Sequence, residues 1–481
     1  MSRREDIEAG LARLVAASWV ERLLLSLAAL AASIVVGGVI VVVSGMAATC
    51  AEPAFAFFGP SSCYDPIGVY VQLFQGAIGN VLADPFNFRL ALTLKETTLL
   101  VFTGLSVAVA FRAGLFNIGS QGQLVAGALA TALAVLFAAP FVPAALGTIV
   151  LVPLGVIAGA IVGGLYGAIP GALKAYADAN EVITTIMLNF VAAQVAFFLV
   201  DAYYRAPESQ SVETRTVPGA AVLESTLFGS GSNFSIFVFV FGLALVAGLY
   251  YLIERTAFGY DLRASGLQSE AAEYGGVDAD RTVVTSMALS GAFAGVGGAV
   301  WVLMVTGRFT ASVPALGFDG ITVSILAGNN PLGVLPAALL FGVLKSGSLA
   351  LQLSAESPPK QLVGVLRGLI ILFVAMPEFF RFIGQRFVTT GRDPVATDGG
   401  ERAGGARSSP DLQSGGGEQV EDLRTSEDER SEARSKGAPR NSERCSRERS
   451  ESSGSEPNAV RRASSVERSE SDGSEPREDE P

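Results

Sequence analysis

Long apolar stretches alternate with short polar connections along most of this 481-residue chain. A helix needs about 20 apolar residues to cross a bilayer, and nine stretches approach or exceed that length. They cover residues 23–46, 93–111, 120–138, 143–171, 181–201, 233–253, 283–305, 331–353 and 361–383. The pattern therefore predicts an all-α, polytopic integral membrane protein.

A tenth apolar run, 314–328, is too short and too rich in glycine for an ordinary span, and it ends in the turn signal Asn329–Asn330–Pro331. We interpret it as a half-span followed by the full span 331–353, which gives about ten transmembrane helices. Residues 67–81 are apolar on one face only, which is typical of a helix lying at a membrane interface.

Charge divides the chain into three parts. Residues 1–22 carry several arginines and precede the first span, so we expect a cytoplasmic N-terminus, followed by a transmembrane domain at 23–390. Arginines also gather in the loop 254–282 and after the last span, which places both on the same side and makes the C-terminus cytoplasmic. From Gly391 to the end there are 22 acidic and 15 basic residues and no aromatic residue. We expect 391–481 to be a disordered, acidic, low-complexity tail.

Composition excludes several kinds of chemistry. The chain has no histidine, which removes histidine bases and histidine metal sites, and its three cysteines lack metal-ligand spacing. Cys50 and Cys63 fall in one expected outer loop, where a disulfide is one of two open readings. No glycine-rich phosphate loop is present, so any ATP and magnesium would bind to another chain. The net charge of −11 argues against nucleic-acid binding.

The stretch 114–128, GLFNIGSQGQLVAGA, places amides and glycines between two apolar spans. Lipid cannot satisfy the hydrogen-bonding groups of Asn117 and Gln121, so they need protein partners or a water-filled cavity. One reading is a polar turn whose amides cap helix ends. The other is a functional site within a water-filled cavity.

A second polar feature lies in 180–190, NEVITTIMLNF. Glu181, Thr185 and Asn189 are four residues apart and form one stripe on an otherwise apolar helix. Such stripes face a partner helix or a pathway. The residues alone leave both readings open.

The loop after residue 254 contains helix-forming residues 268–274 between glycines, which predicts a short amphipathic helix. It is either a solvated helix or a docking helix for a cytoplasmic partner. The next apolar span contains SGAFAGVGGA (290–299), whose small residues permit close helix packing.

Four segments in this order resemble the permeases of ATP-binding-cassette (ABC) importers for branched-chain amino acids, simple sugars and nucleosides. They are GLFNIGSQGQ, which has Gln121 where that family usually has Glu; NEVITTIMLNF; GLQSEAAEYGGVDADR with the span after it; and 317–342, GFDGITVSILAGNNPLGVLPAALLFG. The resemblance covers roughly 20–385. It implies coupling to ATPase subunits by a contact made of Arg263, Gly266, Glu270, Ala271, Ala272 and Gly275. It also supports a pathway role for Asn117, Gln121, Glu181, Thr185 and Asn189.

The resemblance further implies cytoplasmic ABC ATPase subunits, a second and different permease subunit, and an external solute-binding lipoprotein. The expected function is permease-mediated import of a small polar solute across the cell membrane, driven by ATP hydrolysis on those partners, with no enzymatic activity in this chain. A nucleoside is the first expectation and a sugar of the glucose or ribose kind is the second. An ion-coupled secondary transporter is a third reading, which the scarcity of acidic residues in the spans disfavours.

Overall fold

The computed structural model describes residues 19–50, 53–56, 61–223, 227–228, 231–353, 359 and 361–373, with side chains from residue 31 onward except at 55–56. In these ranges the regular structure is helical apart from one hairpin, in which β1 (Phe55–Ala56) pairs antiparallel with β2 (Ser61–Ser62), and two isolated bridges. The all-α prediction is confirmed.

The described helices follow the apolar stretches of the sequence. In chain order they are α2 (Trp19–Ala47), α3 (Pro66–Ile78), α4 (Phe88–Arg112), α5 (Ser120–Ala138), α6 (Gly147–Ala177), α7 (Glu181–Leu199), α8 (Ile236–Arg255), α9 (Ala257–Leu267), α10 (Ser269–Tyr274), α11 (Ala279–Val300), α12 (Leu316–Leu326) and α13 (Pro331–Gln352). A further helical segment covers 361–373. Single π-helical turns prolong α7 (Val200–Tyr204) and α11 (Trp301–Thr306), and short 3₁₀ turns occur at Ala139–Phe141, Ala144–Leu146 and Gly219–Ala221.

Seven described helices are long and apolar enough to cross a membrane, and three shorter apolar helices accompany them, namely Ala31–Ala47, Leu316–Leu326 and Gln361–Phe373. These ten match the ten expected crossings, and the expected half-span is the 11-residue α12. The end of the last expected span, the expected tail 391–481 and most of the N-terminal segment 1–22 lie outside the described residues.

Asparagine and aspartate fix where several helices begin. The side chain of Asn87 accepts a hydrogen bond from the Leu90 amide at the start of α4, and Asn180 does the same for two amides of α7. Asp278 caps α11, and Asn330 caps α13. Each oxygen satisfies an amide that has no partner inside its helix, which matters most where lipid replaces water.

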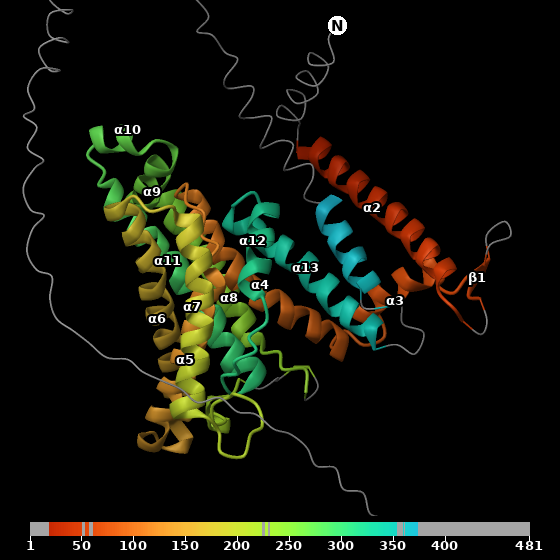
Figure 1. Ribbon diagram of the computed structural model, residues 1–481, viewed down its shortest axis with the longest axis horizontal. Coiled ribbons are helices and arrows are strands. Elements are labelled where there is room, and N and C mark those ends of the chain that lie inside the picture. The colour runs from red at the N-terminus through yellow and green to blue at the C-terminus, as the bar shows by residue number, and fades with distance from the viewer. Residues whose placement is uncertain are drawn as a thin grey trace, which may run out of the picture. The chain divides into compact units, whose positions relative to one another are not determined.

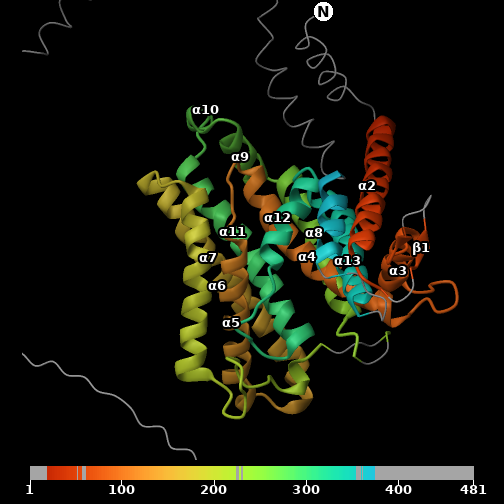
Figure 2. The same cartoon turned by 45° about the vertical axis from the view of Figure 1, so that its right-hand side comes forward.

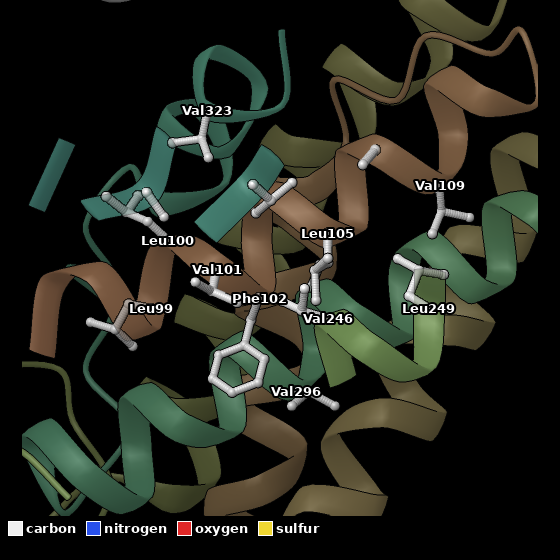
Figure 3. Close-up of a cluster of buried hydrophobic side chains, with 14 of the residues drawn as sticks. Leu99, Leu100, Val101, Phe102, Leu105, Val109, Val246, Leu249, Val296 and Val323 are labelled. Atoms are coloured by element: carbon white, nitrogen blue, oxygen red, sulfur yellow. The ribbon is translucent and has the colours of Figure 1, made fainter. Parts of the chain in front are cut away.

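Helix α4 lies at the centre of the main hydrophobic cluster. Leu100, Phe102 and Leu105 have no exposed surface, and residues of α8, α11, α12 and α13 surround them. Figure 3 shows these side chains with Val246 and Leu249 of α8 and Val323 of α12. Helix α4 is therefore the central helix of the bundle, and α8, α11, α12 and α13 pack against it.

Close packing of small residues joins α6 to α11, as 290–299 led us to expect. A Cβ atom on Gly163 would lie 2.5 Å from the carbonyl oxygen of Gly291, and one on Gly127 of α5 would lie 2.5 Å from the Cα atom of Gly295. Side chains would force these backbones apart, so glycine is what allows van der Waals contact between the helices.

The two ends of the bundle differ in character. Helices α9 and α10 lie together at one end, beyond the ends of α4, α6 and α11 (Figure 1). Toward the other end, α2 leads to a disulfide between Cys50 and Cys63, whose Cα atoms are 5.8 Å apart. Figure 2 shows α12 beside α4 and α13, shorter than either. The sequence pattern predicted α10 but not α9, whose 11 residues are too few for a span and include the charged Asp261 and Arg263.

Candidate functional site

The segment after α4 turns back into the bundle, so α5 begins inside it. The hydroxyl of Ser120, the first residue of α5, lies 3.1 Å from the hydroxyl of Ser106 in α4. Ser106 is six residues before Arg112, the last residue of α4, which corresponds to about 9 Å along the helix. The start of α5 therefore lies inside the bundle below the end of α4, where its polar groups need protein partners.

Asn117 provides many of these partners. Its side chain is almost fully buried and donates from Nδ2 to Oε1 of Gln123 (2.9 Å) and to the hydroxyl of Ser290 in α11 (2.8 Å). Its Oδ1 accepts from the Gly119 amide (3.0 Å) and from Nε2 of Gln123 (3.2 Å). Ser290 in turn donates to the Ser106 carbonyl at 2.6 Å. This satisfied network joins α4, α5 and α11.

The polar stripe of α7 faces α5. Asn189 accepts from the Gly122 amide through Oδ1 (2.7 Å) and donates to the Ile118 carbonyl through Nδ2 (3.0 Å). Thr185 is fully buried and donates to the carbonyl of Glu181 in its own helix at 2.6 Å. The structure thus brings Asn117, Thr185 and Asn189 around the start of α5, where they bind protein groups.

Glu181 lies apart from this cluster. Its carboxylate is 3.6 Å from the ammonium group of Lys174, near the end of α6. The first residue of α7 is therefore an ion-pair partner at the helix end, and it adds negative charge where the helix dipole favours it.

Gln121 points away from the Asn117 network and holds the half-span α12. Its Nε2 donates to the Pro314 carbonyl (2.9 Å), and its Oε1 accepts from the Gly317 amide (2.8 Å). An amide can make both bonds at once because it carries a donor and an acceptor, which a glutamate at this position could not do when ionised. Gln121 remains partly exposed, unlike Asn117 and Gln123.

A cluster of charged groups, which we did not identify from the sequence, lies where α4, α12 and α13 meet. The ammonium group of Lys345 is 3.0 Å from Asp319 and 3.3 Å from Glu96, and Lys95 is 3.6 Å from Glu96. A cavity of about 240 Å³ lies beside it and is lined in part by Lys95, Lys345 and Arg367. Ionisable groups at membrane depth are costly and usually functional. In the sequence, Glu96, Asp319 and Lys345 lie in three separate spans, and nothing in their spacing indicates that they pair.

At the α9–α10 end, an arginine joins three elements. Arg112 donates from Nε to the Asn329 carbonyl, in the turn after α12, at 2.8 Å. Its guanidinium also lies 3.3 Å from the carboxylate of Glu254 at the end of α8, and Arg263 of α9 lies 2.6 Å from the same carboxylate. Two ion pairs and one hydrogen bond therefore link α9, through Glu254 and Arg112, to the turn after the half-span.

The proposed docking residues form a mixed surface at this end. Ala272 is buried against the bundle, whereas Glu270, Ala271 and Gly275 are exposed. Two large apolar side chains, Leu267 (89% exposed) and Tyr274 (96% exposed), flank them. Leu267 and Tyr274 therefore add apolar area to this surface beside Glu270 and Ala271.

Comparison with known proteins agrees with this arrangement. The family model described as "Branched-chain amino acid transport system / permease component" matches residues 90–375, which is more than half of the chain. The chain therefore belongs to this family of ABC transport permeases. It is a multi-pass membrane protein and not an enzyme, and its family implies ATPase and binding-protein partners.

Similar curated proteins are permeases as well. The nucleoside ABC transporter permease NupB of Lactococcus lactis is 32% identical over 65% of this chain and 84% of its own length. The guanosine permease NupP of Bacillus subtilis is 32% identical over 67% of this chain and 89% of its own length. The glucose permease TsgB13 of Haloferax volcanii is 30% identical over 70% of this chain and 88% of its own length. Membership of the family favours the ABC permease over the ion-coupled transporter.

Proposed function

We propose that this chain is the permease subunit of an ABC importer for nucleosides. The observation that carries the solute class is the similarity to a nucleoside permease and a guanosine permease, at 32% identity over more than four-fifths of each. A sugar remains the second candidate because a glucose permease is 30% identical over a similar share.

The proposed topology places both termini and the α9–α10 segment in the cytoplasm. Arginines near the first span, in the loop 254–282 and after the last span support this orientation. The disulfide between Cys50 and Cys63 also supports it, because it lies in a loop that this topology exposes to the oxidising outer side.

Coupling to the ATPase subunits is assigned to α10 and the end of α9. Leu267, Glu270, Ala271 and Tyr274 would enter a groove of the ATPase, and closure of that groove would move the segment as a rigid body. The direct contacts of Gly266 with the 113–114 turn support transmission to α5. The Arg263–Glu254–Arg112 chain supports transmission to α12.

The roles of the pathway residues follow from their exposure. Gln121 is partly exposed and would face the solute, while holding α12 in place. Asn117, Thr185 and Asn189 are buried in protein contacts and would keep the pathway helices in position. Glu181 would anchor the cytoplasmic end of α7 through Lys174.

A second permease subunit is part of the proposal. Several described helices bury few of their residues within this chain; α6 and α7, for example, bury 22% of their most apolar windows. One chain therefore leaves wide apolar surfaces for lipid and for another permease. We expect that subunit to be a different chain, as the sequence resemblance implied.

The test is uptake by the complete system. The chain would be expressed with its ATPase, second permease and binding protein in cells that lack nucleoside and glucose transporters. We expect uptake of radiolabelled guanosine that depends on this chain, competes with other nucleosides and is insensitive to excess glucose. Glucose uptake without guanosine uptake would overturn the nucleoside assignment and support the sugar.

A further inference from the structure

A non-helical segment leads into α12. Residues 311–315 connect Thr310, which forms an isolated bridge with Glu213, to the first turn of α12. The Pro314 carbonyl and the Gly317 amide are bonded to Gln121, next to Ser120. Ser120 in turn contacts Ser106, which lies about 9 Å along α4 from its last residue.

The length of α4 and the thickness of the bilayer show how deep this segment lies. Helix α4 has 25 residues and is therefore about 37 Å long, compared with a hydrocarbon core of about 30 Å. A Cβ on Gly320, in α12, would lie 2.7 Å from the carbonyl carbon of Thr103, about 14 Å from the end of α4. With α4 centred in the bilayer, Ser106 and Thr103 both lie inside the hydrocarbon core.

Lipid cannot be the solvent of this segment. Ala311, Ser312 and Ala315 are exposed, and within the described part of the chain the backbone amides of Ser312 and Val313 have no hydrogen-bond partner. Exposed non-helical backbone is tolerated at membrane depth only where it is covered by protein or lines a water-filled cavity. The sequence provides a reason for the irregularity, since Pro314 has no amide hydrogen and keeps Val313 extended.

One aromatic side chain projects beside this segment. Phe318 is 42% exposed, although both of its neighbours are held in place. The Gly317 amide is bonded to Gln121, and the Asp319 carboxylate is bonded to Lys345 at 3.0 Å. An exposed ring on a fixed backbone offers a flat apolar face at little cost in conformational entropy.

We propose that residues 312–315 line the aqueous solute pathway and that Phe318 stacks against the base of the passing nucleoside. Every base presents a π face, so one phenylalanine can serve different nucleosides. The position of the pathway rests on the geometry alone, whereas the stacking partner rests on the proposed nucleoside function. Ser312 is near the outer loops that form a polar cavity of about 610 Å³ around Glu213 and Arg308, which gives the solute an aqueous route to it.

Thiol labelling tests the position of the pathway. In a Cys445→Ser background of the complete transporter, Ser312→Cys and Ala315→Cys would be exposed to a charged, membrane-impermeant methanethiosulfonate. The matched control is Ile161→Cys, which is 55% exposed on the apolar helix α6. We expect both segment variants to react at least tenfold faster than the control, and guanosine to slow the reaction. Rates equal to the control would show that lipid or a partner subunit covers the segment, and would overturn the proposal.

Uptake kinetics test the stacking. We expect Phe318→Leu and Phe318→Ala to lower the uptake of guanosine about tenfold, which corresponds to about 1.4 kcal/mol, while Phe318→Trp keeps it near the normal rate. Phe237→Ala, at a 67% exposed position of α8, is the control and should transport normally. Normal uptake by Phe318→Leu would overturn the stacking role. Fast labelling of Ser312→Cys in a transporter that carries no nucleoside would support the pathway and refute the nucleoside.

Discussion

Gly114 and Gly266 lie in direct backbone contact, although 152 positions separate them in the sequence. A Cβ on Gly114 would lie 2.7 Å from the carbonyl oxygen of Gly266, and a Cβ on Gly266 would lie 2.8 Å from the Gly114 amide nitrogen. Gly114 also has a φ of +70°, which favours glycine. The turn that leads into α5 and the end of α9 therefore touch with no side chain between them.

Substitution of Gly266 should disturb this contact. In Gly266→Ala the new methyl group meets backbone atoms of Ala113 and Gly114, which cannot move aside as a side chain would, so we expect about 1–3 kcal/mol of strain. Uptake should fall at least tenfold. Gly248→Ala in α8, where a Cβ meets no atom within 4 Å, should transport normally. Equal uptake by the two variants would show that the contact does not matter for transport.

Arg112 should be needed for coupling. Its guanidinium holds the Asn329 carbonyl and the Glu254 carboxylate together, which a lysine with one compact charge cannot reproduce in the same geometry. We expect Arg112→Gln to lower uptake strongly while the ATPase still co-purifies. Arg112→Lys should retain only part of the normal uptake. The measurement is uptake per molecule of ATP hydrolysed in proteoliposomes. An unchanged ratio in Arg112→Gln would contradict the proposed transmission route.

The exposed face of α10 should bind the ATPase. Ala271 is exposed, so Ala271→Arg should leave the permease folded and inserted but prevent co-purification of the ATPase and abolish uptake. Ala83→Arg makes the same substitution at an exposed position of the expected outer loop 47–92 and should leave the complex intact. Recovery of a normal amount of ATPase with Ala271→Arg would place the docking surface elsewhere.

Asn189 should act as a structural link. Asn189→Leu removes the partners of the Gly122 amide and the Ile118 carbonyl, and each buried polar group left unpaired costs about 1–3 kcal/mol. We expect a lower melting temperature of the detergent-solubilised complex and an unchanged order of preference among solutes. A changed solute preference at normal stability would instead place Asn189 on the pathway.

The tail should be dispensable for transport. Residues 391–481 have the composition of a solvated segment that cannot bury a core. We expect a chain truncated after residue 390 to insert and to transport at the normal rate, measured as initial uptake per permease. A loss of more than half of the uptake would assign the tail a role in assembly or regulation.

The membrane-spanning part of the fold could be read from the sequence with few errors. Apolar stretches of span length define the helices because lipid forces the backbone to satisfy its own hydrogen bonds, and this effect is local. The half-span α12 could be predicted from its glycines and from the turn at residues 329–331. Helix α9 escaped prediction because it is too short for a span and mixes apolar with charged residues. Tertiary contacts such as the Arg263–Glu254 ion pair hold it.

The candidate site was predicted in part. The sequence singled out Asn117, Gln121 and Asn189 because amides are rare in apolar spans, but periodicity could not show which partners they meet. The structure pairs Asn189 with the backbone of α5 and Gln121 with that of α12. The Glu96–Lys345–Asp319 cluster was missed, because its members lie in three spans whose neighbours the sequence does not specify.

The sequence by itself determined that this protein is a helical membrane permease, because hydrophobic length and family motifs are properties of single segments. The tertiary structure decided which polar groups use up their hydrogen bonds within the chain and which remain for water or solute. In the motif GLFNIGSQGQ it assigned Asn117 and Gln123 to each other, and Gln121 to the half-span. That division depends on which helices become neighbours, and segments far apart in the chain become neighbours only through packing.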